Sequence, residues 1–274
     1  MRVLHHVTPW LRFVLMLGIL AVTFFPLSGT FASAFGIPLG GRGYGYGAPG
    51  PQPSWFEREW QQYAGFLHGE GLIWFENSLG LALFTVLVCV AVGAPAGYVL
   101  ARARGRLVNG FALAIFLVQS FPAFLLLVPL FLAFAKIGLI DTLGGVAIVY
   151  VALSGAVAIW MFAAYFTSVP IELEEAAWLD GASVFGAFFR VVLRNSLPAV
   201  LSTAIFTFLF AWNDYLVALV FIRSNANYTL GIGLGAAGGS PVLAVLISLP
   251  PILIFALLNR FFSVGGIAGA LSAR

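Results

Sequence analysis

The stretch LGLALFTVLVCVAVGAPAGYVLA, residues 79–101, decides the class of fold to which this chain belongs. It contains no charged side chain, and an apolar run of about 20 residues is the length that a helix needs to cross a bilayer. Further apolar runs extend over residues 11–35, 111–135, 143–168, 199–222 and 242–262. The sequence therefore predicts an all-α membrane protein with six transmembrane helices.

The composition of the whole chain agrees with this prediction and excludes several classes of protein. Of its 274 residues, 61% are hydrophobic and 8% are charged, whereas a soluble domain carries about 25% charged residues. Its 13 cationic residues are scattered and form no basic stripe, so the pattern does not indicate a nucleic acid as partner. Cys89 is the only cysteine, which excludes an internal disulfide, and we expect it to act as a small hydrophobic residue. A soluble enzyme, a secreted disulfide-rich protein and a disordered chain are thereby excluded.

The arginines predict the orientation of the spans. With both termini in the cytoplasm, most of the basic residues lie on the inner side, as the positive-inside rule favours. The inner residues are then Arg2, Arg12, Arg102, Arg104, Arg106, Arg190, Arg194, Arg260 and Arg274, and the outer ones are Arg42, Arg58, Lys136 and Arg223. This topology makes residues 36–77 an external loop and residues 169–198 a cytoplasmic loop of one domain that extends over residues 1–274.

The external segment contains a Gly/Tyr-rich stretch, residues 40–50, which cannot form a regular helix or strand. An aromatic and acidic stretch follows over residues 55–75, and it fits a short amphipathic helix that lies along the membrane surface. Such a helix either anchors the chain at the interface or presents a docking surface to an external partner.

The cytoplasmic loop begins with PIELEEAAWLDGAS, residues 170–183, which predicts two short helices joined at Asp180-Gly181. Acidic residues fall in the first turns, where the helix dipole favours them, and Gly181 permits a left-handed turn. The helical spacing puts Leu173, Ala176, Ala177 and Asp180 on one face of the first helix, and Phe185, Phe188, Phe189 and Val192 on one face of the second. These faces either pack on the membrane domain or dock into a soluble partner, and the pattern alone leaves both alternatives open.

The fifth apolar run contains the one acidic residue that lies well inside a span, Asp214, between Trp212-Asn213 and Tyr215. Ionisable groups inside a membrane usually face the bundle interior or a wet cavity. Polar groups beside aromatic rings suit a pathway for a polar solute, so these four residues are our candidate solute pathway. The alternative is a structural hydrogen-bond network between helices.

Nothing in the sequence predicts a catalytic or metal site. The three histidines are His5, His6 and His68, whose spacing predicts no metal cluster. The chain also lacks a Gly-x4-Gly-Lys-Ser/Thr phosphate-binding loop, so we expect no nucleotide site of that kind.

Glu175-Ala-Ala-x-x-Asp-Gly-Ala182 resembles the coupling loop of ABC importer permeases, which contacts a cytoplasmic ATPase in that family. The resemblance is supported by the segments at residues 76–79, 210–219 and 261–270, which are similar to the maltose-type carbohydrate permeases with six helices. It implies that the ATPase-coupling residues are Glu175, Ala176, Ala177, Asp180, Gly181 and Ala182, and that the C-terminal glycines Gly265, Gly266 and Gly269 contact the ATPases. The chain departs from the family at Arg194, where members usually have a proline.

The resemblance implies a permease subunit of a binding-protein-dependent importer for a sugar or a sugar-like solute, and not an enzyme. It would lie in a bacterial plasma (inner) membrane with a second permease as heterodimer partner, two copies of an ABC ATPase and an external solute-binding protein. ATP and Mg would be bound by the ATPase and not by this chain. The alternative is a polytopic membrane enzyme or scaffold with no transport role.

Overall fold

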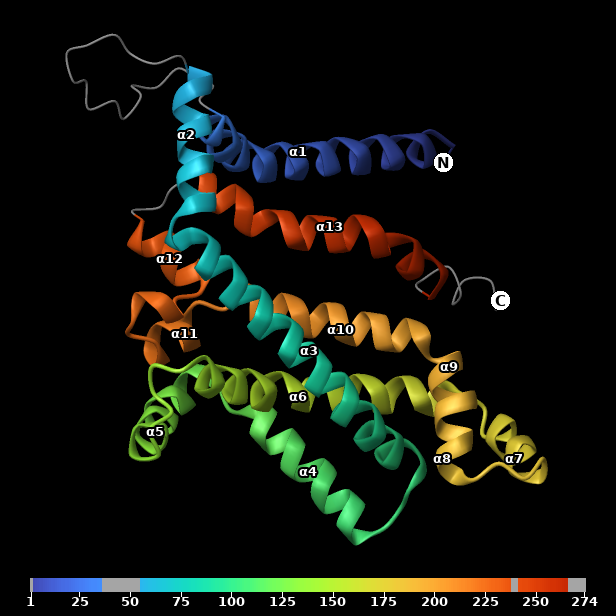
Figure 1. Ribbon diagram of the computed structural model, residues 1–274. Helices are drawn as coiled ribbons and strands as arrows, with labels where there is room; N and C mark the ends of the chain where they lie inside the picture. The colour runs from blue at the N-terminus through green and yellow to red at the C-terminus, as the bar shows by residue number, and fades with distance from the viewer. Residues whose placement is uncertain (1, 36–54, 238–240, 266–274) are drawn as a thin grey trace, which may run out of the picture. The chain divides into compact units, whose positions relative to one another are not determined.

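Helices account for all the regular secondary structure in the part of the chain that the computed structural model describes, residues 2–35, 55–237 and 241–265 (Figure 1). In chain order the elements are α1 (Arg2–Ala34), α2 (Trp55–His68), α3 (Glu70–Arg102), α4 (Arg106–Ser120), α5 (Ala123–Lys136), α6 (Leu143–Ser168), α7 (Glu172–Leu179), α8 (Val184–Ala187), the π-helix η1 (Phe188–Val192), α9 (Leu193–Asn195), α10 (Leu197–Trp212), α11 (Leu216–Phe221), the 3-10 helix η2 (Asn225–Asn227), α12 (Leu230–Ala236) and α13 (Pro241–Gly265). The predicted all-α fold class is confirmed.

The chain divides into two compact units, one formed by residues 1–69 and 234–250 and the other by residues 70–233 and 251–274. In the first unit, α1 is apolar and exposed along most of its length. The Tyr63 hydroxyl of α2 donates to the carbonyl of Ala34 at 3.4 Å. The candidate functional residues of the loop and of the fifth span all belong to the second unit, which is described below.

Three helices of the described chain are long and apolar enough to cross a membrane: Phe13–Ala34, Glu70–Arg102 and Leu143–Ser168. Two bent pairs, α4 with α5 and the α8–α9 segment with α10, raise the number to five if each pair forms one broken span. A shorter apolar helix extends over Val242–Leu257. All six predicted runs are thus largely helical, and the number of six spans stays a prediction.

Helices α3 and α6 pack closely because small residues face each other. A Cβ atom at Gly97 would lie 2.6 Å from the Cβ of Phe162, and one at Gly93 would lie 3.4 Å from the Cβ of Ala158. Two small residues four apart on a helix allow two backbones to approach in this way in membrane proteins. Helix α10 packs on α3 and α6 in a similar way. Small residues recur every four positions on its buried face: Ala199, Thr203, Thr207 and Ala211.

The predicted third span, residues 111–135, is not one helix. It breaks at Phe121, which has an extended conformation with φ −78° and ψ 130°, and the axes of α4 and α5 differ by 99°. Pro122 explains the break, because a residue before proline is disfavoured in the helical region.

The predicted fifth span, residues 199–222, is also interrupted. Helix α10 ends at Trp212, the chain leaves the helix at Asn213 to Tyr215, and α11 resumes at Leu216. The expectation of one continuous span was therefore wrong here, and the break contains the acidic residue that the sequence marked.

The boundary of the external loop also needs correction. We expected a single amphipathic stretch over residues 55–75 and a second span from residue 79, but α2 ends at His68 and α3 begins at Glu70. Residues 70–78 therefore extend the second span beyond its predicted start. The Gly/Tyr-rich stretch at residues 40–50 lies outside the described residues.

Candidate coupling loop and solute pathway

The loop between α6 and α10 contains two short helical arms that meet at Gly181. The backbone N–H of Ala182 donates to the carbonyl of Ala177 at 2.9 Å, and that of Gly181 donates to Trp178 at 3.0 Å. This pair of bonds is the Schellman motif, which closes a helix through a left-handed residue. Gly181 has the φ of +85° that the motif requires, as the sequence predicted. The Ser183 hydroxyl then accepts a bond from the N–H of Gly186 at 3.1 Å and begins the second arm.

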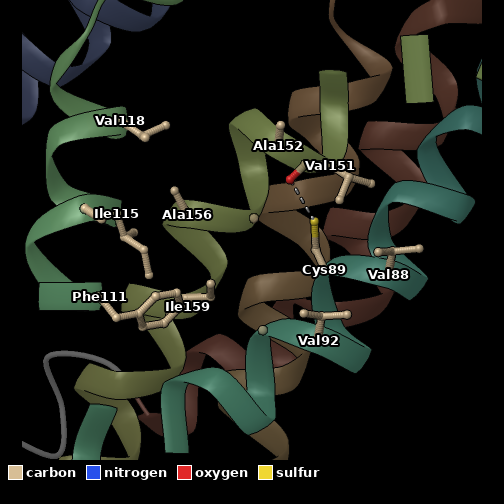
Figure 2. Close-up of a pocket in the computed structure, with 13 residues that line it drawn as sticks. Val88, Cys89, Val92, Phe111, Ile115, Val118, Val151, Ala152, Ala156 and Ile159 are labelled. Carbon is tan, nitrogen blue, oxygen red and sulfur yellow. Dashed lines mark hydrogen bonds between the residues drawn. The ribbon is translucent and has the colours of Figure 1, made fainter. Parts of the chain in front are cut away.

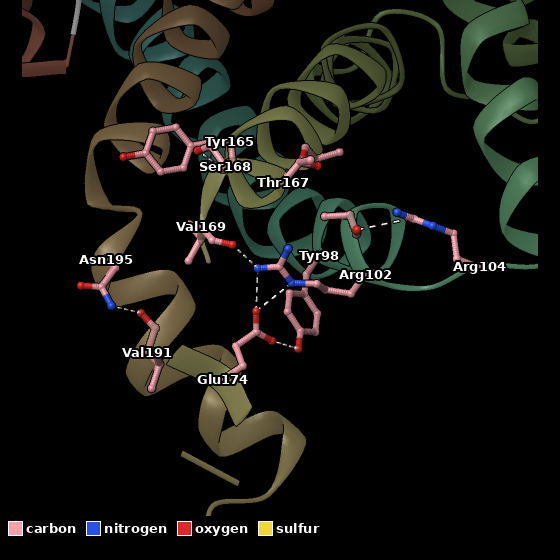
Figure 3. Close-up of polar contacts among 12 residues, drawn as sticks. Tyr98, Arg102, Arg104, Tyr165, Thr167, Ser168, Val169, Glu174, Val191 and Asn195 are labelled. Carbon is pink, nitrogen blue, oxygen red and sulfur yellow. Dashed lines mark hydrogen bonds and ion pairs between the residues drawn. The ribbon is translucent and has the colours of Figure 1, made fainter. Parts of the chain in front are cut away.

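The first arm, α7, is fixed by a buried carboxylate that we did not predict. Glu174 is 0% exposed and forms an ion pair with Arg102 of α3 at 2.7 Å. The Tyr98 hydroxyl of α3 donates to the same carboxylate at 2.5 Å (Figure 3). The predicted face of α7 is uncovered in this chain, with Leu173 exposed, which agrees with the docking alternative, and Glu174 takes the buried position.

The second arm divides the aromatic face that the sequence predicted. Phe188 and Val192 are buried in a core cluster with Phe162 and Phe166 of α6, whereas Phe185 and Phe189 are exposed. The π-helical geometry over residues 188–192 explains this division, since it changes the helical spacing on which the prediction was based.

The second arm returns to α10 through a bend of 76°. Ser196 lies between the two helices with φ −104° and ψ 20°, and Pro198 occupies the first turn of α10. The Asn195 side chain donates to the carbonyl of Val191 at 2.8 Å. At Arg194, where the sequence departs from the pattern expected of the family, the chain stays helical.

The predicted coupling residues surround the tip of the two arms. Glu175, Ala176, Asp180 and Gly181 are exposed, and Ala177 and Ala182 are half-buried. Beside them Leu179 is 89% exposed and Phe185 is 77% exposed. The loop thus has a buried base and an exposed apolar tip with two acidic residues.

The break in the fifth span is organised by Asp214. Its carboxylate accepts bonds from the Tyr150 hydroxyl of α6 at 2.8 Å and from the N–H of Ala218 at 3.1 Å. A longer contact of 3.4 Å joins it to the N–H of Val217. The structure thus contains hydrogen bonds between helices. Such bonds are what we expected if Asp214 had a structural role instead of a role in a solute pathway.

The neighbours of Asp214 differ in exposure. Asn213 is exposed and its amide donates to the carbonyl of Leu209 at 2.9 Å, and Tyr215 is 43% exposed. Trp212 is buried and stacks on Phe208 with a centroid distance of 5.5 Å. The structure therefore places all four predicted pathway residues at one break in the helix, and leaves Asn213 and Tyr215 accessible. Their role in a pathway stays a prediction.

At the N-terminal end of α6, away from the coupling loop, Asp141 orders the segment after α11. Its carboxylate accepts bonds from the Ser224 hydroxyl, from the N–H of Ser224 at 2.8 Å and from the N–H of Arg223 at 2.9 Å. These bonds, with that from the Ser224 hydroxyl the largest cause, lower the pKa of Asp141 to about 2. Asp141 has a positive φ of 59°, a conformation that aspartate tolerates better than most residues.

The same segment is bonded to the first turns of α3. The Trp74 indole donates to Asn225 Oδ1 at 2.9 Å, and the Asn77 amide donates to the carbonyl of Tyr228 at 3.0 Å. We did not predict this polar cluster. Its signal in the sequence is a group of polar side chains, Asp141, Asn77 and Asn227, next to apolar runs.

Two cavities of the second unit have opposite character. One of about 380 Å³ lies between α3, α4 and α6 and is lined by apolar side chains and by Cys89, which is buried as expected (Figure 2). The other, of about 530 Å³, lies under the base of the loop, beside Arg102, Arg104 and Glu172. The lining of the cavity between α3, α4 and α6 has no arrangement of polar groups that would suit the binding of a sugar.

Among the described residues, no group of three His, Cys, Asp or Glu side chains could hold a metal ion. Gly265 is the last residue of α13, and Gly266 and Gly269 lie outside the described residues. The absence of a metal and the tail contact therefore stay predictions.

The apolar spans, two of which are broken, and the two-armed loop define an α-helical, multi-pass membrane protein. Residues 93–265 match the model of the binding-protein-dependent transport system inner membrane component family. The chain belongs to this family and is an ABC transporter permease subunit. This membership favours the transporter over the polytopic enzyme or scaffold.

Individual relatives agree with the family. An ABC transporter permease protein, ORF1, of Streptomyces antibioticus is 39% identical over 203 residues, which are 71% of this chain and 89% of that protein. The trehalose transport system permease protein SugB of Mycobacterium tuberculosis is 33% identical over 222 residues, 76% of this chain and 79% of that protein.

The fold is also that of a solved transporter. The crystal structure of a bacterial ABC transporter involved in the import of the acidic polysaccharide alginate matches with a TM-score of 0.74. The match covers 94% of this chain and 97% of that chain at 20% sequence identity, so it shows the fold alone.

Proposed function

We propose that this permease subunit imports a sugar or a sugar-like solute and that residues 169–198 couple it to a separate ATPase. The observation that carries the proposal is the two-armed loop, with Glu174 buried at its base and Leu179 and Phe185 exposed at its tip. Relatives named as trehalose and maltose permeases support the class of solute.

The loop suits a contact that transmits force. Its tip exposes apolar side chains that no described part of this chain covers, and such surfaces mark interaction sites. Ala176 and Ala182 are small, so a partner surface can approach the backbone closely. Glu175 and Asp180 offer carboxylates to basic side chains or backbone amides of the ATPase. The ATPase would bind ATP and Mg²⁺, and this chain would bind neither.

A crosslinking experiment tests the coupling contact. We would place Ala182→Cys in a Cys89→Ser background, purify the assembled transporter and treat it with a short bifunctional thiol reagent. We expect a crosslink to the ATPase. Ile137→Cys, at an exposed position on the opposite side of the predicted membrane, is the matched control and should give none. Absence of a crosslink from position 182, with the ATPase present in the complex, would contradict the coupling assignment.

For the solute pathway, we infer that Asn213 and Tyr215 contact the solute, with Asp214 holding the break open and Trp212 supporting it. Asn213→Ala should then lower uptake while the amount of assembled complex stays the same. Asp214→Asn should also lower uptake, since it removes the charge that three donors share. Loss of assembly in Asn213→Ala would show instead that the amide is structural.

We further propose that this chain pairs with a different permease and with two ATPase copies. It would receive its solute from an external binding protein. It would lie in a bacterial inner membrane with both termini in the cytoplasm. The C-terminal glycines would contact the ATPases, because glycine lets a backbone approach closely. Deletion of residues 265–274 should then reduce transport. An active homodimer without a second permease would contradict the heterodimer.

A further inference from the structure

Two side chains at the inner end of α3 hold one carboxylate of the loop. Tyr98 and Arg102 are one helical turn apart and therefore lie on the same face of α3. The Tyr98 hydroxyl reaches Glu174 Oε2 at 2.5 Å, and the Arg102 Nε reaches Glu174 Oε1 at 2.7 Å (Figure 3). Both oxygens of the carboxylate are thus bonded to α3.

Arg102 also holds the end of α6. Its Nη2 atom donates to the carbonyl of Val169 at 2.8 Å, directly after the last residue of α6. The planar guanidinium therefore fixes the start of the loop and the first arm in one geometry, which the single ammonium of a lysine cannot reproduce.

Tyr98 contacts the second arm as well. Its ring lies 4.9 Å from that of Phe188 in the π-helix and 6.4 Å from that of Phe166 in α6. A single residue of α3 thus contacts the first arm through its hydroxyl and the second arm through its ring. Both arms are joined to a span that does not flank the loop in the sequence.

Burial makes this connection stiff. Glu174 is 0% exposed, and a buried carboxylate is strongly unfavourable without its partners. Any motion that separated Glu174 from Arg102 without admitting water would leave an uncompensated charge. The first arm and the inner end of α3 are therefore constrained to move together, whereas the bend at Ser196 has no comparable bond among the described residues.

We propose that Tyr98, Arg102 and Glu174 form a transmission link that carries displacement of the coupling loop directly into α3. The proposal rests on the proposed coupling function of residues 169–198. These three residues are positioning residues, since they contact neither the solute nor the nucleotide. Motion of the loop would reach α3 through this link. Since Gly93 and Gly97 hold α3 close to α6, the two helices would then move as one rigid group.

The test measures coupling rather than activity alone. We would reconstitute the complete transporter with its binding protein and measure ATP hydrolysed per solute imported. Glu174→Gln should raise this ratio at least 5-fold, because a neutral amide does not hold the Arg102 guanidinium as firmly. The crosslink from Ala182→Cys to the ATPase should persist. Glu76→Gln, an exposed acid of α3 outside the loop and without an ion pair among the described residues, is the matched control and should leave the ratio unchanged.

Two milder variants protect the test against a failure to assemble. Tyr98→Phe retains the ring contacts and removes only the hydroxyl, and Arg102→Lys retains the charge but not the fork. Both should assemble normally and raise the ratio of ATP to solute, by less than Glu174→Gln. If uptake falls only in proportion to the amount of assembled transporter, with an unchanged ratio, the cluster is structural and the proposal is wrong.

The outcomes also separate this proposal from the proposed function. If residues 169–198 do not couple to the ATPase, the crosslink from Ala182→Cys is absent in the otherwise unchanged transporter. If only the transmission link is wrong, that crosslink forms and Glu174→Gln transports with the unchanged ratio.

Discussion

Gly181 shows how much a single residue determines in the loop. Its φ of +85° is costly for a side chain with a Cβ, by about 1–2 kcal/mol, and more for a β-branched one. No atom lies within 4 Å of the position that a Cβ would take, so the strain comes from the backbone alone. We therefore expect Gly181→Val to shift the turn and uncouple ATP hydrolysis from uptake in proteoliposomes. Gly181→Asn should keep most of the coupling, because asparagine tolerates this conformation. Equal transport by Gly181→Val and the unmodified chain would contradict this account.

Asp141 determines the local structure at the N-terminal end of α6, away from the coupling loop. Its pKa is lowered to about 2, chiefly by the Ser224 hydroxyl. A carboxyl whose folded pKa is depressed stabilises the fold above its unfolded pKa of about 4, and this contribution disappears as the pH falls through about 2. At neutral pH the bonds are therefore fully present, and Asp141→Ala should remove them.

Proteolysis reports on that change. Arg223 is exposed, and its N–H is bonded to Asp141. In Asp141→Ala, trypsin added to the outer side should cleave after Arg223 several-fold faster, as followed by gel electrophoresis. Thr142→Ser, which retains the hydroxyl that caps α6, is the control and should be cleaved at the original rate. An unchanged rate in Asp141→Ala would show that other contacts order this segment.

At the scale of the elements, the close contact of α3 with α6 makes a sharp prediction. A Cβ at Gly97 would lie 2.6 Å from the Cβ of Phe162 and 2.9 Å from the nitrogen of Ala163, so the helices must separate to accommodate it. Overpacking of this kind typically costs about 1–3 kcal/mol. Gly97→Ala should therefore lower the melting temperature of the solubilised protein.

Gly80 provides the control on the same helix. Nothing lies within 4 Å of a Cβ built there, and alanine is favoured over glycine inside a helix by about 1 kcal/mol. Gly80→Ala should be neutral or stabilising. If both variants have the same melting temperature, the α3–α6 contact is not the constraint that the geometry indicates.

The helices also show what a sequence can and cannot predict. The span over residues 143–168 and the left-handed turn at Gly181 depend on local chemistry, and both agree with the structure. The buried position of Glu174 depends on Arg102, which lies 72 residues earlier, so the periodicity of α7 alone does not predict it. The break at Asp214 arises because its carboxylate is bonded to Tyr150 and to the backbone of α11, and hydropathy does not record such bonds. The coupling role and the pathway role remain predictions, since both need partners that a single chain does not contain.

At the scale of the whole second unit, α3 connects two polar clusters. Its first turns carry Trp74 and Asn77, which hold the segment after α11, and its last turns carry Tyr98 and Arg102, which hold the loop. Figure 1 shows the loop helices α7 and α8 at one end of α6 and helices α5 and α11 at its other end. The two clusters are thus the fixed ends of one helix.

The length of α3 determines how these ends relate to a membrane. Its 33 residues extend about 50 Å at 1.5 Å per residue, and the hydrocarbon core is about 30 Å thick. The helix is therefore long enough to cross the bilayer and to project from it. Because the arginines Arg102, Arg104 and Arg106 gather at one end, the positive-inside rule predicts that this end lies in the cytoplasm and the Glu70 end outside.

Reporter fusions test this topology. A reporter that is active only in the cytoplasm should be active when fused after Arg104 and inactive when fused after Glu70, and a reporter that is active only outside should give the reverse. The two fusion points flank a single helix, so no uncertainty about the broken spans enters the comparison. Activity of the same reporter at both points would mean that α3 does not cross the membrane. Both polar clusters would then lie on one side, and the loop, the pathway residues and the segment after α11 would all need new assignments.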